Sequence, residues 1–432
     1  MLLSVILCSI TVFFMVLSII VKPYIAVGKL KIGLYSIIAF IGAMLCIISG
    51  ALPLSVAISG ITKNTAVNPL KILTLFISLS LISIYLGDSG FFTFVAQKLF
   101  EKNKGGAFRL FLTLYITVSI LTLFTSNDII ILTFTPLICI FCKNAKISPV
   151  PFLFGEFIAA NTFSMGLIIG NPTNLYLAGS NFITFIEYIK VMFLPTLVSG
   201  VLTFFALLLI FRKQLFNTKL ILSTERKIVP VRKAPMIASI VALLLTIILL
   251  SISDLIGVES YLICLLTFLA LTVLLLIIEL IKHKSVLGVL HSLKKAPYEL
   301  VPFVLSMFVL VLTLDHAGLT KLIGEKIITG TKLDGISFGF ISALSSNLLN
   351  NIPMSVLFEK IVNGTSVYAL YGSIIGSNIG AFVSPVGALA GIMWSKILSG
   401  EGVKISFKKF MALGAFPALI AILSSTFILL IL

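Results

Sequence analysis

The stretch from Leu110 to Cys142 decides the fold, and it reads LFLTLYITVSILTLFTSNDIIILTFTPLICIFC. Two apolar runs of about ten to fifteen residues flank the polar cluster Thr125-Ser126-Asn127-Asp128, and each run falls short of the ~20 residues that a spanning helix needs. Polar residues are costly in hydrocarbon unless they face a cavity or a partner. The stretch therefore predicts a re-entrant hairpin near residues 107–142, with its polar residues at the tip.

A second polar cluster occurs in the other half of the chain. Ser345-Ser346-Asn347-Leu348-Leu349-Asn350-Asn351 predicts a second hairpin near residues 336–361. Asparagine and serine side chains, with unwound backbone carbonyls, supply the oxygen ligands that a sodium ion takes. The alternative is an ordinary helix terminus capped by Ser or Asn. Because the cluster occurs twice, we expect a transport site built from a structural repeat.

Two further clusters interrupt long apolar runs. Gly170-Asn171-Pro172-Thr173-Asn174 lies within one run, and Gly376-Ser377-Asn378-Ile379-Gly380 followed by Ser384-Pro385-Val386-Gly387 lies within another. Proline removes a helix donor and glycine permits unusual backbone angles. We expect both helices to break inside the membrane, where their free N–H groups and carbonyls face ions. The alternative is a proline kink without a binding role.

The composition indicates an all-α polytopic membrane protein. Of 432 residues, 59% are hydrophobic and only 11% are charged. We expect each half to hold five spans and one hairpin, with amphipathic stretches at 89–103 and 317–329 along the membrane interface. The expected spans lie near residues 2–21, 33–52, 70–87, 151–179 and 184–211, and near residues 236–253, 259–281, 299–315, 368–398 and 406–431.

The loop charges predict the topology. One set of alternate loops holds 24 of the 31 lysine and arginine residues, and positive loops stay in the cytoplasm. Both termini are then outside, and an odd number of spans inverts the second half relative to the first. The predicted domains are a first inverted repeat at 1–211, a basic cytoplasmic linker at 212–235 and a second inverted repeat at 236–432. The net charge of +16 reflects this topology, and no nucleic-acid partner is expected.

Few ionisable residues lie inside the apolar stretches. Asp128 adjoins Asn127, and we expect it to be the charge-bearing participant in transport. Glu156 is either a coupling residue or a helix-start carboxylate, and the sequence leaves both interpretations open. Asp88 and Asp315 are expected to be interfacial caps.

These motifs resemble the ion transporter superfamily, and especially its arsenite efflux permease branch. Residues 126–137, SNDIIILTFTPL, look like the "ND…L..TP" segment of that branch, and residues 345–353 look like its "SS…NN.P" segment. Residues 375–394, which end in Trp394, look like its "IG..LG…P.GSLA…W" segment. The superfamily also contains sodium-proton antiporters and dicarboxylate-citrate carriers.

The resemblance implies an inverted-repeat carrier with two re-entrant hairpins and two discontinuous helices, working by an elevator motion. It implies ion-driven transport of a small anion, a metalloid hydroxide or sodium, and a homodimer. The coupling ion is sodium or a proton. ATP drive would require a separate ATPase subunit, because the sequence contains no Walker A pattern.

We expect the site to form where the hairpin tips meet the helix breaks. The expected substrate- or ion-binding residues are Ser126, Asn127, Asp128, Gly170, Asn171, Thr173, Asn174, Ser346, Asn347, Asn350, Asn351, Ser377, Asn378 and Ser384. The expected hinge residues are Pro172, Gly376, Gly380, Pro385 and Gly387. A sodium ion is expected near Asn127, Gly170, Asn347 and Gly376.

The expected function is ion-coupled secondary active efflux of a small inorganic anion or metalloid, similar to arsenite or antimonite. We expect it in the inner or plasma membrane. The alternatives are a sodium/proton antiporter or a sodium-coupled dicarboxylate or citrate symporter, and more remotely a channel or an intramembrane enzyme. An enzyme is disfavoured because His283, His291 and His316, the three histidines, form no zinc or catalytic motif.

Overall fold

The structure is a computed structural model that describes residues 1–21, 24–27, 30–64, 68–102, 106–218 and 231–432. Lys22, Lys29 and Lys104, which belong to the basic loops that predicted the topology, lie outside these residues. Residues 219–230 of the predicted basic linker also lie outside them.

The described chain is helical, which confirms the predicted fold class. In the first half the helices are α1 (Leu2–Val21), α2 (Leu34–Ile48), α3 (Leu54–Thr62), α4 (Pro69–Asp88), α5 (Phe91–Lys102), α6 (Ala107–Phe124), α7 (Asn127–Asn144), α8 (Val150–Phe163), α9 (Pro172–Ser180) and α10 (Phe185–Asn217). In the second half they are α11 (Lys233–Ser251), α12 (Ser253–Ile256), α13 (Ser260–His283), α14 (Leu287–Leu293), α15 (Leu300–His316), α16 (Leu319–Ile327), α17 (Asp334–Leu349), α18 (Asn351–Val362), α19 (Val367–Ile379), α20 (Leu389–Gly400) and α21 (Phe407–Ile431).

Some elements differ from the prediction. A short antiparallel ribbon joins β1 (Tyr24–Val27) to β2 (Leu30–Gly33), where no strand was expected. The short helices α3 and α14 were also not predicted. The predicted linker at 212–235 is partly helical, because α10 continues to Asn217 and α11 begins at Lys233.

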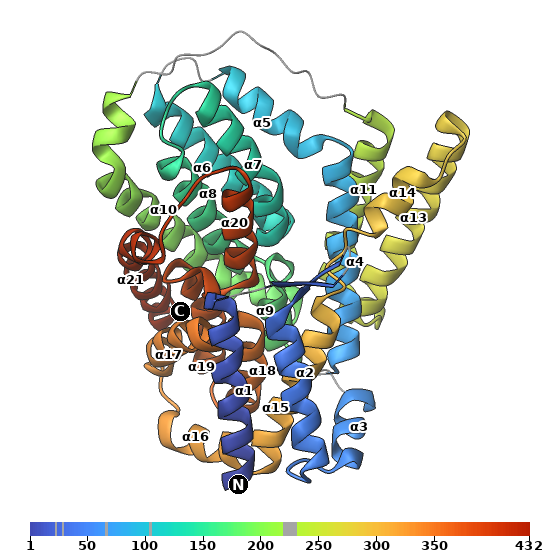
Figure 1. Cartoon of the computed structure of the whole chain (residues 1–432), viewed down its shortest axis with the longest axis vertical. Coiled ribbons are helices and arrows are strands. Elements are labelled where there is room, and N and C mark those ends of the chain that lie inside the picture. Colours follow the sequence, from blue (N-terminus) through green and yellow to red (C-terminus); the bar gives the residue numbers. More distant parts are fainter. Residues whose placement is uncertain (22–23, 28–29, 65–67, 103–105, 219–230) are drawn as a thin grey trace.

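The element order of the first half recurs in the second. In both halves a hairpin follows an amphipathic helix, and a broken helix and a long helix follow the hairpin. Figure 1 shows the hairpin α6–α7 in the upper part of the molecule and the hairpin α17–α18 in the lower part. The amphipathic helices α5 and α16 likewise lie at opposite ends. This arrangement is what the inverted-repeat prediction requires, and the orientation of each half in a membrane stays a prediction.

Helix lengths revise the first hairpin. Seven described helices are long and apolar enough to cross a membrane, and the bent pair α15–α16, at 74°, makes up to eight. Both α6 and α7 have 18 residues and belong to this set. The expectation that each helix of this hairpin is too short to span was wrong, because α6 and α7 continue through Arg109 and Lys143 at their outer ends. The arms of the second hairpin, α17 and α18, have 16 and 12 residues.

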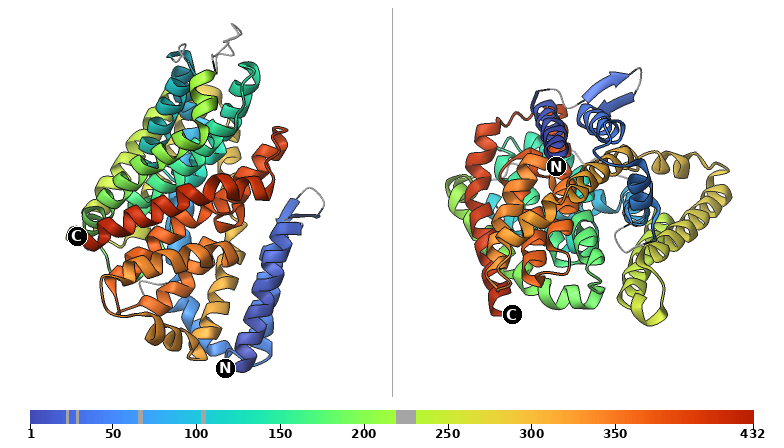
Figure 2. Two further views of the ribbon diagram at one scale, coloured as in Figure 1. Left: turned by 90° about the vertical axis from the view of Figure 1, so that its left-hand side faces the viewer. Right: turned by 90° about the horizontal axis from the view of Figure 1, so that it is seen from below.

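The hairpins and broken helices of both halves pack into one unit, which we call the hairpin body (α6–α10 and α17–α21). Within it α10 packs along α21, α17 along α19, α7 against α20, and α9 against α18. The remaining long helices, α1, α2, α4, α11, α13 and α15, are the outer helices. Figure 2 shows α11 and α13 standing to one side of the hairpin body.

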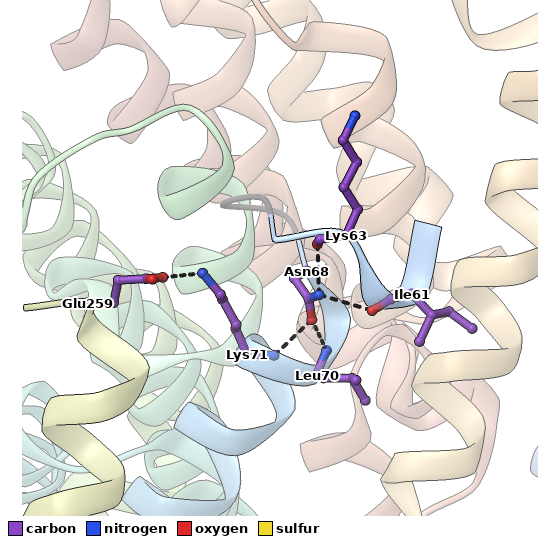
Figure 3. Close-up of polar contacts among 6 residues, drawn as sticks. All are labelled: Ile61, Lys63, Asn68, Leu70, Lys71 and Glu259. Carbon is purple, nitrogen blue, oxygen red and sulfur yellow. Dashed lines mark hydrogen bonds and ion pairs between the residues drawn. The ribbon is translucent and has the colours of Figure 1, made fainter. Parts of the chain in front are cut away.

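Helix α4 is tied to its neighbours at its start. Asn68 caps it, since the Asn68 side-chain oxygen accepts hydrogen bonds from the backbone N–H of Leu70 and Lys71 at 2.8 and 3.2 Å (Figure 3). The Asn68 amide donates to two carbonyls at the end of α3, at 3.0 and 2.9 Å. Lys71 forms an ion pair with Glu259, which directly precedes α13. These contacts fix the start of α4 against α3 and α13.

A second set of contacts holds the other end of α4. Asp88 accepts a hydrogen bond from Ser292 Oγ and pairs with Lys295 Nζ, both at 2.6 Å. Arg232 pairs with Glu279 at 2.8 Å and donates to the backbone carbonyl of Asp88 at 3.0 Å. We call these five residues the α4 clamp. It joins α4 to the helices α11, α13 and α14.

Candidate functional site

The two helix breaks meet through side chains at the centre of the hairpin body. The side-chain oxygen of Asn378 accepts hydrogen bonds from Ser164 Oγ at 2.9 Å and from Asn171 Nδ2 at 2.8 Å. The Asn378 amide donates to the side-chain oxygen of Asn174 at 2.7 Å. One residue of the second half therefore bonds three residues around the break of the first half.

A hydroxyl pair extends this network. Thr173 Oγ1 lies 3.0 Å from Ser377 Oγ, one residue before Asn378. The exposed fraction of each side chain in the network is 2% or less. A buried polar group without a partner lowers the stability of the fold by about 1–3 kcal/mol. These bonds stabilise the protein chiefly because they leave none of the buried groups unpaired. We call the six residues the amide cluster: Ser164, Asn171, Thr173, Asn174, Ser377 and Asn378.

The first break precedes Pro172. Two single 3₁₀ turns, Ser164–Gly166 and Ile168–Gly170, replace the α-helix there. Pro172 is the first residue of α9, where its missing N–H costs nothing, and Asn171 caps α9 by accepting from the Thr173 N–H at 3.2 Å. Gly170 is required at the turn because a Cβ there would overlap the carbonyl of Ser164. The break therefore depends on the sequence motif itself.

The second break lies between α19 and α20. It consists of the 3₁₀ turns Gly380–Phe382 and Pro385–Gly387. Of the predicted hinge residues, Gly376 lies inside α19, where a Cβ would overlap Ser342 Oγ of α17. The structure thus places Gly376 at a close helix contact, and Gly380, Pro385 and Gly387 in the break itself.

The tip of the first hairpin contacts the helix that breaks beside it. Asn127 starts α7, is 2% exposed, and donates to the side-chain oxygen of Asn161 at 3.0 Å. Ser126 Oγ is buried without a hydrogen-bond partner. Asp128 is half-buried, and its carboxylate has no hydrogen-bond or ion-pair partner among the described residues. Asn161 was not predicted, although, like Asn378, it lies in the last turn of the helix that precedes its break.

The tip of the second hairpin lies within the predicted cluster, near its end. Helix α17 continues to Leu349, so Ser346 and Asn347 occupy its last turn. The Asn347 amide donates to the carbonyl of Gly380 at 2.8 Å, and its oxygen accepts from Ser384 Oγ at 2.6 Å. This pair of bonds attaches the end of α17 to the second break.

Asn350 forms the actual tip between α17 and α18. Its φ is +74° and its ψ is 154°, a backbone conformation that residues with a side chain rarely adopt. The Asn350 amide donates to the carbonyl of Val386 at 3.0 Å. Asn351 begins α18, and its side-chain oxygen is buried without a partner. Each hairpin tip thus binds the break of its own half, and in the described part of the chain no hydrogen bond joins the two tips.

Two clefts border this arrangement on the side of the outer helices. The first has a volume of about 20 Å³, and its lining includes Ser80 and Ser83 of α4 with Thr125, Ser126 and Asn171. The second, of about 30 Å³, lies between α4, α9, α15 and α18. Among the described residues, no charged side chain lines either cleft. The serines of α4 were missed from sequence because nothing local distinguishes them from buried packing residues.

Among the described residues, no group of three or more His, Cys, Asp or Glu side chains lies together. What the site offers instead is amide, hydroxyl and backbone groups, each able to donate or accept. Such a set suits a small polar solute or a sodium ion.

Comparisons with known proteins identify relatives of this chain. A family model described as "Citrate transporter" matches residues 24–371. The arsenical pump membrane protein of Escherichia coli (strain K12) is 25% identical over 355 residues, covering 78% of this chain and 81% of that protein. The putative arsenical pump membrane protein of Bacillus subtilis is 24% identical over 403 residues, covering 86% of this chain and 89% of that protein.

A solved structure shares the fold. The crystal structure of the YdaH transporter of Alcanivorax borkumensis covers 100% of this chain and 97% of its own, with a TM-score of 0.54 and 16% sequence identity. The likeness concerns the arrangement of helices.

Proposed function

The chain belongs to the citrate transporter family of the ion transporter superfamily and is a membrane transporter; from that premise we propose ion-coupled secondary active efflux of a small metalloid hydroxide or inorganic anion of the arsenite or antimonite class. We place it in the cell membrane with sodium or a proton as the coupling ion. The relatives named as arsenical pump membrane proteins support this class of cargo. The proposed binding groups are those at the two hairpin tips and in the amide cluster.

One observation carries the choice of cargo: the amide cluster contains no charged side chain. Carboxylate and phosphate groups are usually recognised by arginine or lysine, often through paired hydrogen bonds. Asparagine and hydroxyl groups instead match a small solute whose own hydroxyls donate and accept. Asp128, at the first tip, would repel a multivalent anion. An uncharged metalloid hydroxide fits these groups better than citrate does.

A second candidate is symport of a dicarboxylate or citrate. Helices α7, α9, α18 and α20 all begin at the tips and breaks, and helix N-termini attract anions. The family description also favours this function. Recognition by the helix N-termini favours a dicarboxylate or citrate, whereas recognition by the uncharged side chains favours a metalloid hydroxide.

The test is exchange of radiolabelled solutes by the full chain in proteoliposomes. We expect saturable exchange of arsenite that unlabelled antimonite inhibits and citrate does not. Exchange of citrate alone would establish the second candidate. No exchange of either solute, relative to protein-free liposomes, contradicts both. The double variant Asn127→Ala, Asn347→Ala is expected to lose exchange, and normal exchange by that variant would contradict the assigned site.

A further inference from the structure

Glu156 is a carboxyl group enclosed in the hairpin body. It lies on α8 with an exposed fraction of 0%. Its Oε1 accepts a hydrogen bond from Thr135 Oγ1 at 2.8 Å, whereas its Oε2 has no partner. No described cation forms an ion pair with it. Because an unpaired ionised carboxylate is very costly inside a protein, the neutral acid is the favoured form here.

Trp394 lies between this carboxyl group and a cavity. Its indole N–H is buried without a hydrogen-bond partner, as is Glu156 Oε2. The indole packs against Phe157 and Phe154, on either side of Glu156, with ring centroids 5.1 and 5.7 Å apart. Trp394 also lines a cavity of about 310 Å³ whose rim includes Lys404. Trp394 therefore covers the carboxyl group on the side that faces the cavity.

No positive charge offsets Glu156 in the described structure. Trp394 of α20 contacts α8 through Phe154 and Phe157, and Lys396 of the same helix is exposed. The other helices packed against α8 are α6, α7, α10, α19 and α21. Their basic residues nearest the same end, Arg109, Lys143, Arg212, Lys408 and Lys409, are exposed and make no ion pair with Glu156.

We propose that Glu156 is the proton-binding site that couples transport to a proton gradient, with Trp394 controlling its access to the cavity; this rests on the proposed ion-coupled transport. Displacement of α20 moves Trp394 and lets water reach the carboxylic acid. The acid then gives its proton to water in the cavity, and the carboxylate takes up a proton from the other side of the membrane when the carrier faces that side. One proton thus crosses the membrane in each cycle.

Glu359 provides a matched control. It is also 0% exposed, and it lies on α18, which packs against α9. It differs in having charged and polar partners: Lys360 Nζ lies 3.3 Å from one carboxylate oxygen, and Asn363 donates to the other at 2.9 Å. With an ammonium group beside it, Glu359 is a structural carboxylate.

The experiment compares Glu156→Gln with Glu359→Gln in the reconstituted full chain. Labelled arsenite is the probe, and its accumulation is measured with and without an imposed pH gradient. We expect the wild-type protein and Glu359→Gln to accumulate arsenite several-fold when the gradient is applied, and Glu156→Gln to show no increase. A gradient-driven increase in Glu156→Gln equal to that of the wild type overturns the proposal.

An infrared measurement tests the proposal without knowledge of the cargo and without relying on the variant to fold. At pH 7 the wild-type protein should show the absorption band of a protonated carboxyl group, which Glu359→Gln retains and Glu156→Gln lacks. Absence of the band from the wild type overturns the proposal even if Glu156→Gln does not fold. If the band is present but arsenite is not transported, the proposed cargo is contradicted. The band still supports Glu156 as the proton-binding site.

Discussion

Asn378 and Asn174 are 204 residues apart in the chain, yet the amide of Asn378 donates to the side-chain oxygen of Asn174 at 2.7 Å. The two halves are thus joined by side chains that belong to their helix breaks. This bond connects the two helix breaks, which the sequence motifs had placed in one site, and it makes the amide cluster sensitive to single substitutions.

Asn378→Ala should abolish solute exchange and lower the free energy of unfolding by about 2–4 kcal/mol, because it leaves Ser164, Asn171 and Asn174 without their partner. Exchange in proteoliposomes and thermal unfolding in detergent measure the two effects. The control is Asn217→Ala, at the exposed end of α10, which should change stability by less than about 0.5 kcal/mol. Wild-type exchange by Asn378→Ala would contradict a role for the amide cluster.

Asn127 and Asn161 should show energetic coupling. Their side chains share one buried hydrogen bond of 3.0 Å, so the double variant to alanine should cost about 1 kcal/mol less than the sum of the single variants. Equilibrium unfolding of the four proteins in detergent gives this difference. Additive effects would show that the bond does not hold the first hairpin tip.

Gly376→Ala should destabilise the protein by about 1–3 kcal/mol, because the added methyl group meets Ser342 Oγ and the backbone of α17. Gly179→Ala in α9 is the matched control, since no other atom lies within 4 Å of its added Cβ. We expect that control to be neutral or slightly stabilising, as alanine favours a helix. Equal melting temperatures for both variants would contradict the close contact of α17 with α19.

Glu279→Gln should weaken the α4 clamp. Glu279 is 6% exposed and pairs with Arg232, so its loss should cost about 1–2 kcal/mol. Glu325→Gln is the control, because Glu325 lies 3.9 Å from Lys321 on an exposed helix face and should cost less than about 0.5 kcal/mol. Both values come from unfolding at low and high salt. A larger loss in Glu325→Gln would be incompatible with the clamp.

Sequence patterns predicted most of the fold because apolar length and polar interruption decide what a membrane segment does. The break near Gly170 is an example: glycine, asparagine and proline in one place force the helix to end and restart. Patterns failed where a helix end depends on packing. Helix α17 passes through Ser346 and Asn347, and Asn347 bonds there to Gly380 and Ser384, distant partners that the local sequence does not show.

The candidate site was only partly predictable for the same reason. The motifs contain Asn127 and Asn378, but their partners Asn161 and Ser164 lie in apolar surroundings that resemble a simple buried helix. Which residues face one another depends on how two distant segments pack. The packing of Trp394 against Phe154 and Phe157, on either side of Glu156, is of this kind and could not have been predicted from either segment.

The two clefts between the outer helices and the hairpin body have a mechanical consequence. Within the described structure, no hydrogen bond or ion pair joins α4 or α15 to α9 or α18, and apolar side chains such as Phe76 and Val304 fill most of the boundary. If the hairpin body slides along this boundary, no polar bond breaks. The dispersion attraction that its apolar side chains lose in one position is restored by new neighbours in the next. The energy barrier to sliding between the hairpin body and the outer helices is therefore low, because the polar bonds lie within each of them.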